Sequence, residues 1–299
     1  MLQAAREQLQ AFIIKSGKSQ KQVAKEIGIS SAVISQFLSG IYAGNNEDVA
    51  DKVLRYLEVG ESRLMRIEVP TFCAELRNAK QVLFAATYAH QNNEISLVYG
   101  DAGAGKTTAL KHYAENNPGV IFITANACSR SPRAILHLVT EAVGKIPAGN
   151  QFIMMRNLVE ALSGSNRLLI IDEADHLTPN ALQAIRNLND EAGIGIVLSG
   201  NDRIKHQMYG RGSLQFDQLR TRLSCKKKVT NKYLLDEIRQ LFPNADADCL
   251  KHLHHVACKE SLRTAIKRYT FAAQCAAMKG QALDMNFLRQ GEIVQLEAE

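Results

Sequence analysis

The chain has 299 residues, enough for one three-layer α/β domain together with two small helical domains. Its six cysteines are scattered with no CxxC pair, which is typical of free thiols in a reducing compartment and argues against a disulfide-stabilised secreted fold. Residues 1–10 are polar, so no signal peptide is predicted, and no apolar run approaches the roughly 20 residues of a spanning helix. We therefore expect a soluble, cytoplasmic protein with no membrane partner.

Two short amphipathic segments on either side of Gly28 predict a helix-turn-helix between Ser19 and Leu38, with Ser30 suited to cap the second helix. The outward face of that helix consists of small and polar residues, namely Ser31, Ala32, Ser35 and Gln36. We take Ser31, Ser35 and Gln36 as candidate DNA contacts. Because this face has no arginine fork for guanine, base-specific readout is not expected, and docking of a protein partner stays an alternative.

Residues 100–107 have the sequence GDAGAGKT, which follows the apolar run 95–99 and precedes a predicted helix over 106–116. This is the context of a Walker A loop, and the motif that follows disfavours the alternative of an ordinary glycine-rich turn. The glycines let the backbone N–H groups point at phosphate, beside the positive end of the helix dipole. Lys106 is expected to reach the β- and γ-phosphates of ATP, and Thr107 to bind Mg²⁺. The predicted nucleotide-binding residues are Gly100, Asp101, Ala102, Gly103, Ala104, Gly105, Lys106, Thr107 and Thr108.

A continuous apolar run over 168–171 ends in Asp172 and Glu173, which predicts a parallel strand buried on both faces with two carboxylates at its end. Open α/β sheets bind ligands at this edge. Asp172 is expected to hold Mg²⁺ through a water molecule, and Glu173 to polarise the attacking water. Either carboxylate alone would serve to cap the next helix, but together with the Walker A loop the pair predicts ATP hydrolysis.

The run from Asp172 to Asp175 and His176 also matches the signature of a helicase class. A helicase of that class needs a second RecA-like domain and a His-Arg-x-Gly-Arg run, and the sequence offers neither. We therefore assign Asp175 and His176 to the start of the helix whose body begins near Thr178.

A third apolar strand, predicted over 194–199, is followed by Gly200 and Asn201. AAA+ proteins place a polar residue, sensor 1, at this position, and the motifs together resemble that superfamily. The resemblance implies that Asn201 is sensor 1 and that Arg263, at the start of a late helix, is sensor 2. It also implies that Arg222, with Arg220 as the alternative, is an arginine finger acting on the nucleotide of a neighbouring subunit. A solvated basic helix end stays an open alternative for either arginine.

The fold class that follows is an α/β AAA+ P-loop ATPase core, with a parallel sheet and helices on both faces, between an N-terminal all-α helix-turn-helix domain and a C-terminal helical lid. The predicted boundaries are 1–60 for the helix-turn-helix domain, 61–72 for a linker, 73–231 for the nucleotide-binding core and 232–299 for the lid. Pro70 marks the linker. The lid is expected to be helical over 233–241, 247–258, 262–278 and 285–296.

The net charge of +6 is accounted for by one stretch, residues 201–232, which contains nine basic residues and two acidic ones. Such a local field attracts polyanions, and phosphate contacts supply most sequence-independent affinity for nucleic acid. The candidate DNA contacts from charge and position are Arg130, Arg133, Arg156, Lys205, Lys226, Lys227 and Lys228. A solvated surface strand stays the alternative for the three consecutive lysines.

His254 and Cys258 are four residues apart and would share one face of a predicted helix. Two ligands on one helix, with no partner pair elsewhere, are weak evidence for zinc. We expect surface histidines that pack beside Leu250 and Leu253.

Most of the chain resembles the transposition protein B family of Mu-like bacteriophages, whose members are target-DNA-binding ATPases. The resemblance rests on five segments of the sequence: 21–47, 103–107, 170–177, 200–203 and 262–263. It implies ATP and Mg²⁺ as ligands, and ATP-bound subunits that assemble as a helical filament on duplex DNA without sequence preference. It further implies that the filament delivers target DNA to a DDE transposase and stimulates strand transfer, with ATP hydrolysis driving release. The expected location is the bacterial host cytoplasm.

Two other classes share these motifs. An AAA+ loader or motor of another DNA-processing system would form stable hexamers and remodel a protein or a duplex. An ATP-switched transcription regulator would bind a defined operator as a dimer. The nearly neutral face of the helix-turn-helix argues against the regulator.

Overall fold

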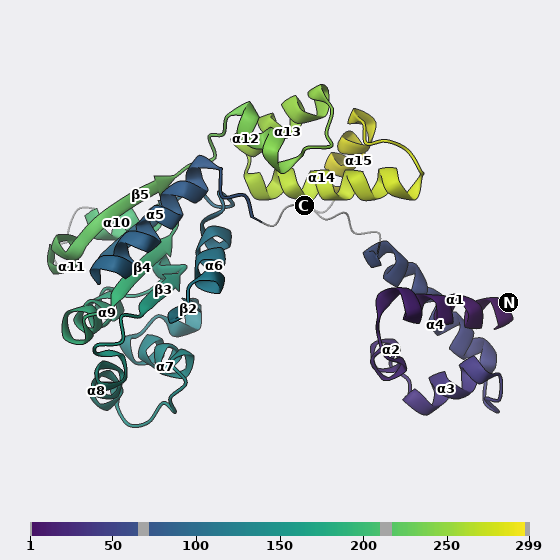
Figure 1. The fold of residues 1–299 in the computed structure, drawn as a ribbon, viewed down its shortest axis with the longest axis horizontal. Helices are drawn as coiled ribbons and strands as arrows, with labels where there is room; N and C mark the ends of the chain where they lie inside the picture. Colours follow the sequence, from purple (N-terminus) through teal and green to yellow (C-terminus); the bar gives the residue numbers. More distant parts are fainter. Residues whose placement is uncertain (1, 65–71, 210–216, 297–299) are drawn as a thin grey trace. The chain divides into compact units, whose positions relative to one another are not determined.

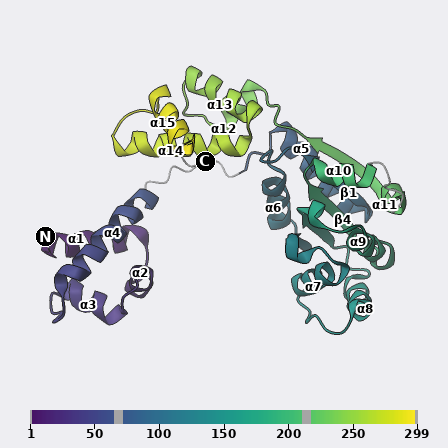
Figure 2. The same cartoon turned by 180° about the vertical axis from the view of Figure 1, so that it is seen from behind.

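The computed structural model describes residues 2–64, 72–209 and 217–296, whose helices and strands are drawn in Figures 1 and 2. The chain divides into two compact units. One unit consists of Met1–Glu68 with Thr270–Glu299, and the other is Val69–Tyr269. Among the described residues, no helix is long and apolar enough to cross a membrane.

Residues 2–64 form a helical domain with the helix-turn-helix at its centre. Its helices are α1 (Leu2–Ser16), α2 (Gln20–Ile27), α3 (Ser31–Ser39) and α4 (Asn46–Leu64). Gly28 ends α2 in the left-handed region at φ 83°, and Ser30 Oγ accepts from the Val33 backbone N–H to cap α3. Phe37 and Ile34 are fully buried in the core that all four helices share. The linker predicted over 61–72 stays a prediction: α4 continues to Leu64, and residues 65–71, with Pro70, lie outside the described residues.

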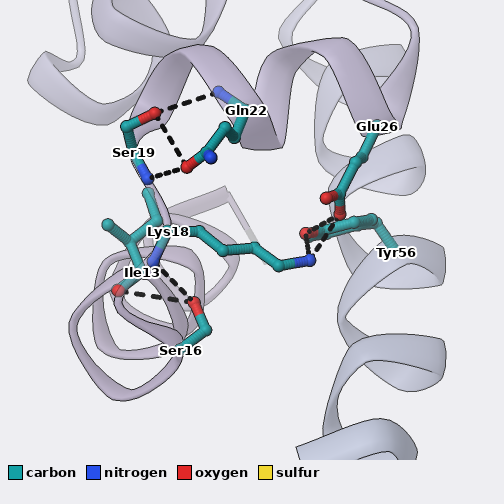
Figure 3. Close-up of polar contacts among 7 residues, drawn as sticks. All are labelled: Ile13, Ser16, Lys18, Ser19, Gln22, Glu26 and Tyr56. Atoms are coloured by element: carbon teal, nitrogen blue, oxygen red, sulfur yellow. Dashed lines mark hydrogen bonds and ion pairs between the residues drawn. The ribbon is translucent and has the colours of Figure 1, made fainter. Parts of the chain in front are cut away.

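A polar network fastens the start of the helix-turn-helix to α4 (Figure 3). Lys18 Nζ donates to Glu26 Oε2 at 2.6 Å, and the Tyr56 hydroxyl donates to the same oxygen at 2.7 Å. Beside this network, Ser19 and Gln22 form a capping box that satisfies the first N–H groups of α2. The turn before α2 is therefore held by side chains from two other elements.

The second unit is built on a five-stranded sheet in the order β2-β3-β4-β1-β5, in which every described pairing is parallel. The strands are β1 (Ile95–Gly100), β2 (Val120–Thr124), β3 (Leu168–Asp172), β4 (Gly195–Gly200) and β5 (Leu223–Val229). Every residue of β3 and β4 is buried, as expected of central strands covered on both faces. Because the strands are parallel, the ends of β1, β3 and β4 lie at one edge.

Helices cover both faces of the sheet. On one face, α5 (Arg77–Asn92) and α6 (Lys106–Asn116) share an apolar core with Val98, Ile170 and Val197. On the other face, α7 (Pro132–Ala142), α8 (Gln151–Leu162), α9 (Pro179–Ala192) and α10 (Asp202–Tyr209) pack over Leu97, Ile171 and Leu198. Short 3₁₀ turns, η1 (Ala127–Ser129) and η2 (Ala174–His176), follow β2 and β3, and α11 (Asp217–Arg222) precedes β5.

The C-terminal part is helical, as predicted. It consists of α12 (Leu235–Leu241), α13 (Ala247–Lys259), α14 (Leu262–Met278) and α15 (Met285–Leu296). Phe242, after α12, is fully buried and its ring centroid lies 4.6 Å from that of Tyr269 in α14. This ring contact holds the middle of α14 against the residue that follows α12.

Candidate nucleotide-binding site

The loop between β1 and α6 has the backbone of a phosphate-binding loop. Gly100, Gly103 and Gly105 lie at φ 130°, 70° and 94°, a region that glycine adopts at little cost. At Gly100 a side chain would also collide with the Val229 carbonyl oxygen in β5. The loop leads directly into the first turn of α6, so its N–H groups and the helix dipole act on the same place.

Lys106 Nζ lies within this loop and donates to the carbonyl oxygens of Gly100 at 2.9 Å and Asp101 at 2.8 Å. Burial lowers the pKa of Lys106, and the negative charges of Asp172 and Glu173 oppose that shift. The ammonium is thus placed among carbonyl oxygens and close to the two carboxylates at the end of β3.

Asp172 is buried and both of its carboxylate oxygens are engaged. Thr107 Oγ1 donates to Oδ2 at 2.6 Å, and Ser199 Oγ donates to Oδ1 at 2.7 Å. A hydroxyl beside a carboxylate is an oxygen donor set suited to Mg²⁺, so these two residues fit the predicted metal site. Ser199 was missed from sequence, because its role depends on β4 lying between β1 and β3.

Asn201 follows β4 and is held by the buried carboxylate of Asp175. Its Nδ2 donates to Asp175 Oδ2 at 2.8 Å, and its backbone N–H donates to Oδ1 at 3.2 Å. The assignment of Asp175 and His176 to the start of the next helix was wrong: they form the separate turn η2, and Thr178 caps α9. Asp175 is therefore a positioning residue for Asn201.

Glu173 lies between Asp172 and this turn in the left-handed region at φ 54°, an uncommon conformation for a residue with a side chain. Its side chain is exposed and lines the same cleft as Lys106 and Asn201. An exposed carboxylate at the cleft wall is placed to accept a proton from water.

The cleft has a volume of about 280 Å³ and is lined by residues of two chemical kinds. The apolar ones are Phe72, Leu76, Ala79, Leu241, Leu262 and Ile266. The others are residues 102–108, Glu173, Asn201 and two lid cations, Arg263 and Lys267. Apolar side chains for a base and polar groups for phosphates suit a nucleoside triphosphate. Lys267, one helical turn after Arg263, was not predicted as a site residue.

Neither predicted arginine finger lines this cleft. Arg222 precedes β5, and its Nε lies 3.1 Å from Asp190 Oδ1 in α9. Arg220 pairs with Asp217 and lies over the Tyr209 ring at 5.5 Å. The start of β5 pairs with the start of β1, so both arginines lie at the sheet edge opposite the Walker A loop.

The candidate DNA contacts fall into separate groups. Lys226 lies over the Tyr209 ring at 5.1 Å, and Lys205 lies over the Tyr99 ring at 5.6 Å. Lys228 pairs with Asp202, whereas Lys227 lies over Phe84 on the α5 side of the strand. Arg130 follows η1, and Arg133 and Arg156 belong to α7 and α8. Ser31, Ser35 and Gln36 are exposed on α3, as predicted.

Comparison with known proteins matches residues 89–208 to the AAA domain and residues 9–64 to a helix-turn-helix. The ATP-dependent target DNA activator B of Escherichia phage Mu is 31% identical over 277 residues, which cover 90% of this chain and 88% of that protein. The chain belongs to the Mu-like transposition protein B family. The Mu-like prophage FluMu DNA transposition protein B of Haemophilus influenzae is 33% identical over 68% of this chain and 71% of that protein.

Family membership and the AAA domain confirm the predicted fold class and make the chain an ATPase. The counterpart of Escherichia phage D108, also named ATP-dependent target DNA activator B, is 31% identical over 90% of this chain and 88% of that protein. A solved Walker-type ATPase of Pyrococcus abyssi has a TM-score of 0.47 at 12% identity, over 78% of this chain and 79% of that chain. The individual site residues stay predictions that mutation can test.

We expect Asp175→Ala to lower the rate of ATP hydrolysis by about 100-fold while changing ATP affinity by no more than about threefold, because Asn201 then loses the acceptor that orients it. Asp175→Asn keeps one amide oxygen as an acceptor and should recover part of the rate. Steady-state hydrolysis and equilibrium binding measure the two effects. Asp248→Ala, which removes an exposed lid carboxylate, is the control. Hydrolysis at the wild-type rate in Asp175→Ala would exclude the positioning role.

Proposed function

We propose that this chain is an ATP-dependent target DNA activator that assembles on duplex DNA without sequence preference. In this proposal the assembly presents captured DNA to a DDE transposase and stimulates strand transfer, and ATP hydrolysis releases the DNA. The observation that carries the proposal is the placement of Thr107, Asp172 and Asn201 at one sheet edge in a chain that aligns over 90% of its length with a protein named ATP-dependent target DNA activator B.

In the proposed hydrolysis step, Lys106 and the loop N–H groups bind the β- and γ-phosphates. Bound Mg²⁺, with Thr107 as a ligand and Asp172 behind a water molecule, would neutralise charge on the phosphates. Glu173 accepts a proton from the attacking water, and Asn201 orients that water or the γ-phosphate. Each of these side chains lies at the edge where β1, β3 and β4 end.

The position of Arg222 supports assembly as part of the ATP cycle. At a rise of roughly 3.3 Å per residue, the length of β5 separates Arg222 from Val229 by roughly 20 Å, so Arg222 lies far from its own cleft. A residue that serves the next subunit's nucleotide makes a head-to-tail interface, and such interfaces propagate into rings or helical filaments. ATP binding and assembly would then be linked.

The DNA contact that we favour is a basic cluster formed by Lys205, Arg220 and Lys226 around Tyr99 and Tyr209. The rings hold the cations, and Lys205 and Lys226 leave their charge available to a phosphate backbone, whereas Arg220 is also paired with Asp217. Lys227 lies on the opposite face of β5 and is not part of this cluster. The exposed side of α3 offers only neutral groups and would add little to affinity for DNA.

Electron microscopy of the protein with non-specific duplex DNA tests the assembly directly. We expect DNA-coating filaments with ATP, and none with ADP, without nucleotide or with Lys106→Ala, because assembly needs a bound triphosphate. Closed hexamers would instead support a loader or motor. Discrete dimers on one preferred sequence would contradict the proposal and support a transcription regulator.

A mixing experiment tests whether Arg222 acts between subunits. Arg222→Ala and Glu173→Gln should each abolish DNA-stimulated hydrolysis. An equimolar mixture should recover up to about a quarter of the wild-type rate, because random head-to-tail neighbours recreate some complete sites. Arg220→Ala mixed with Glu173→Gln is the matched comparison for the alternative finger. No recovery in the Arg222 mixture would exclude action in trans.

The DNA face is tested by the salt dependence of binding. We expect Lys226→Ala to reduce the slope of log affinity against log salt concentration by about 0.9, the effect of one lost phosphate contact. Lys80→Ala removes an exposed lysine of α5 that is paired with Glu75, and it should leave the slope unchanged. Fluorescence anisotropy with duplexes of several sequences measures both variants. Equal slopes for Lys226→Ala and the wild type would contradict this assignment.

A further inference from the structure

Three successive carbonyl oxygens of the Walker A loop accept hydrogen bonds from groups outside the loop. The Ala102 oxygen accepts from Asn231 Nδ2 at 3.2 Å, and the Gly103 oxygen accepts from the Arg263 backbone N–H at 3.3 Å. The Ala104 oxygen lies 3.5 Å from Asn78 Nδ2. The loop is therefore held by α5, by the segment after β5 and by α14.

These contacts decide where the loop N–H groups point. In a planar trans peptide the C=O and the following N–H point in opposite directions. Anchoring the carbonyls of residues 102–104 therefore also fixes the directions of the N–H groups of residues 103–105, which line the cleft.

Asn231 makes more hydrogen bonds than the other two anchors, and both the nitrogen and the oxygen of its side-chain amide are hydrogen-bonded. Its backbone N–H donates to Asp101 Oδ2 at 2.8 Å, at the start of the loop. Its Nδ2 donates both to the Ala102 oxygen and, at 3.1 Å, to the Glu260 oxygen at the end of α13. Its Oδ1 lies 3.4 Å from the donating Tyr233 hydroxyl. Burial raises the pKa of Tyr233, so this hydroxyl keeps its proton.

The lid also meets the loop by direct packing. A side-chain carbon at Gly103 would come within 2.8 Å of Ser261 Cβ and 3.2 Å of Arg263 Cβ, so only glycine lets the start of α14 approach this closely. Ser261 follows Glu260, whose carbonyl Asn231 holds. One amide thus ties the loop peptide to the junction between α13 and α14.

We propose that Asn231 is a positioning residue that sets the conformation of the phosphate-binding loop and transmits nucleotide binding to the lid helix α13. A shift of the Ala102 peptide on phosphate binding moves the Asn231 amide, and the amide carries the Glu260 carbonyl with it. Thermodynamic linkage makes the coupling reciprocal, so a change in lid position alters affinity for the nucleotide. The proposal depends on ATP binding and not on the proposed role in transposition.

Affinity is the first readout. We expect Asn231→Ala to weaken binding of a fluorescent ATP analogue about tenfold, because it removes two hydrogen bonds at the loop and lid. Asn231→Asp should be weaker still, because a carboxylate oxygen would then face the Ala102 and Glu260 carbonyl oxygens. Asn244→Ala, an exposed asparagine of the same half of the chain, is the matched control and should bind normally. An unchanged dissociation constant in both Asn231 variants would overturn the proposal.

Coupling is the second readout, measured by hydrogen exchange of residues 247–259 in the full-length protein at saturating ATP. We expect ATP to change the protection of these amides in the wild type and in Asn244→Ala, and to leave it unchanged in Asn231→Ala although the nucleotide is bound. If Asn231→Ala does not fold, Asn231→Asp replaces it, since a carboxylate keeps the size of the side chain but cannot donate to the Ala102 or Glu260 oxygen. ATP-dependent protection of wild-type size in the folded variant would overturn the transmission.

Discussion

The hydrogen bond from Thr107 to Asp172, at 2.6 Å, is the constraint on which the site depends. It joins the first turn of α6, the helix that follows β1, to the end of β3. The strands β1 and β3 are not neighbours in the sheet, because β4 lies between them. The bond therefore requires that all three strands keep their register and end at one edge. Ser199 fixes the second oxygen of Asp172 from β4, so each central strand contributes to the same carboxylate.

That dependence explains what the sequence could predict. The Walker A loop was predicted from contiguous residues, because its glycines and Lys106 act through local backbone geometry. Asp172 and Glu173 followed from an unbroken apolar strand that ends in charge. Ser199 and Asp175 were not predicted as site residues, because their partners come from other strands and turns. No local pattern distinguishes them from an ordinary buried serine or a capping aspartate.

The basic stretch over 201–232 shows that residues adjacent in sequence need not share a surface. Lys226, Lys227 and Lys228 are adjacent in sequence and were grouped as one candidate surface, but side chains alternate along a strand. Lys227 consequently contacts Phe84 on the α5 side, whereas Lys226 joins Arg220 at Tyr209. Charge counted along the chain overestimates the charge that any one ligand can meet, and the aromatic rings show which cations share a face.

The two edges of the sheet carry different parts of the proposed hydrolytic site. The cleft lies at the carboxyl edge of the sheet, and Arg222 at the amino edge, where Asp190 holds it. A chain that carries its phosphate site and its proposed arginine finger at opposite edges cannot complete the site alone, so hydrolysis under the proposed function becomes a property of neighbours. Nucleotide turnover would then depend on assembly, and the tie between loop and lid through Asn231 would couple the lid of each subunit to that subunit's own nucleotide.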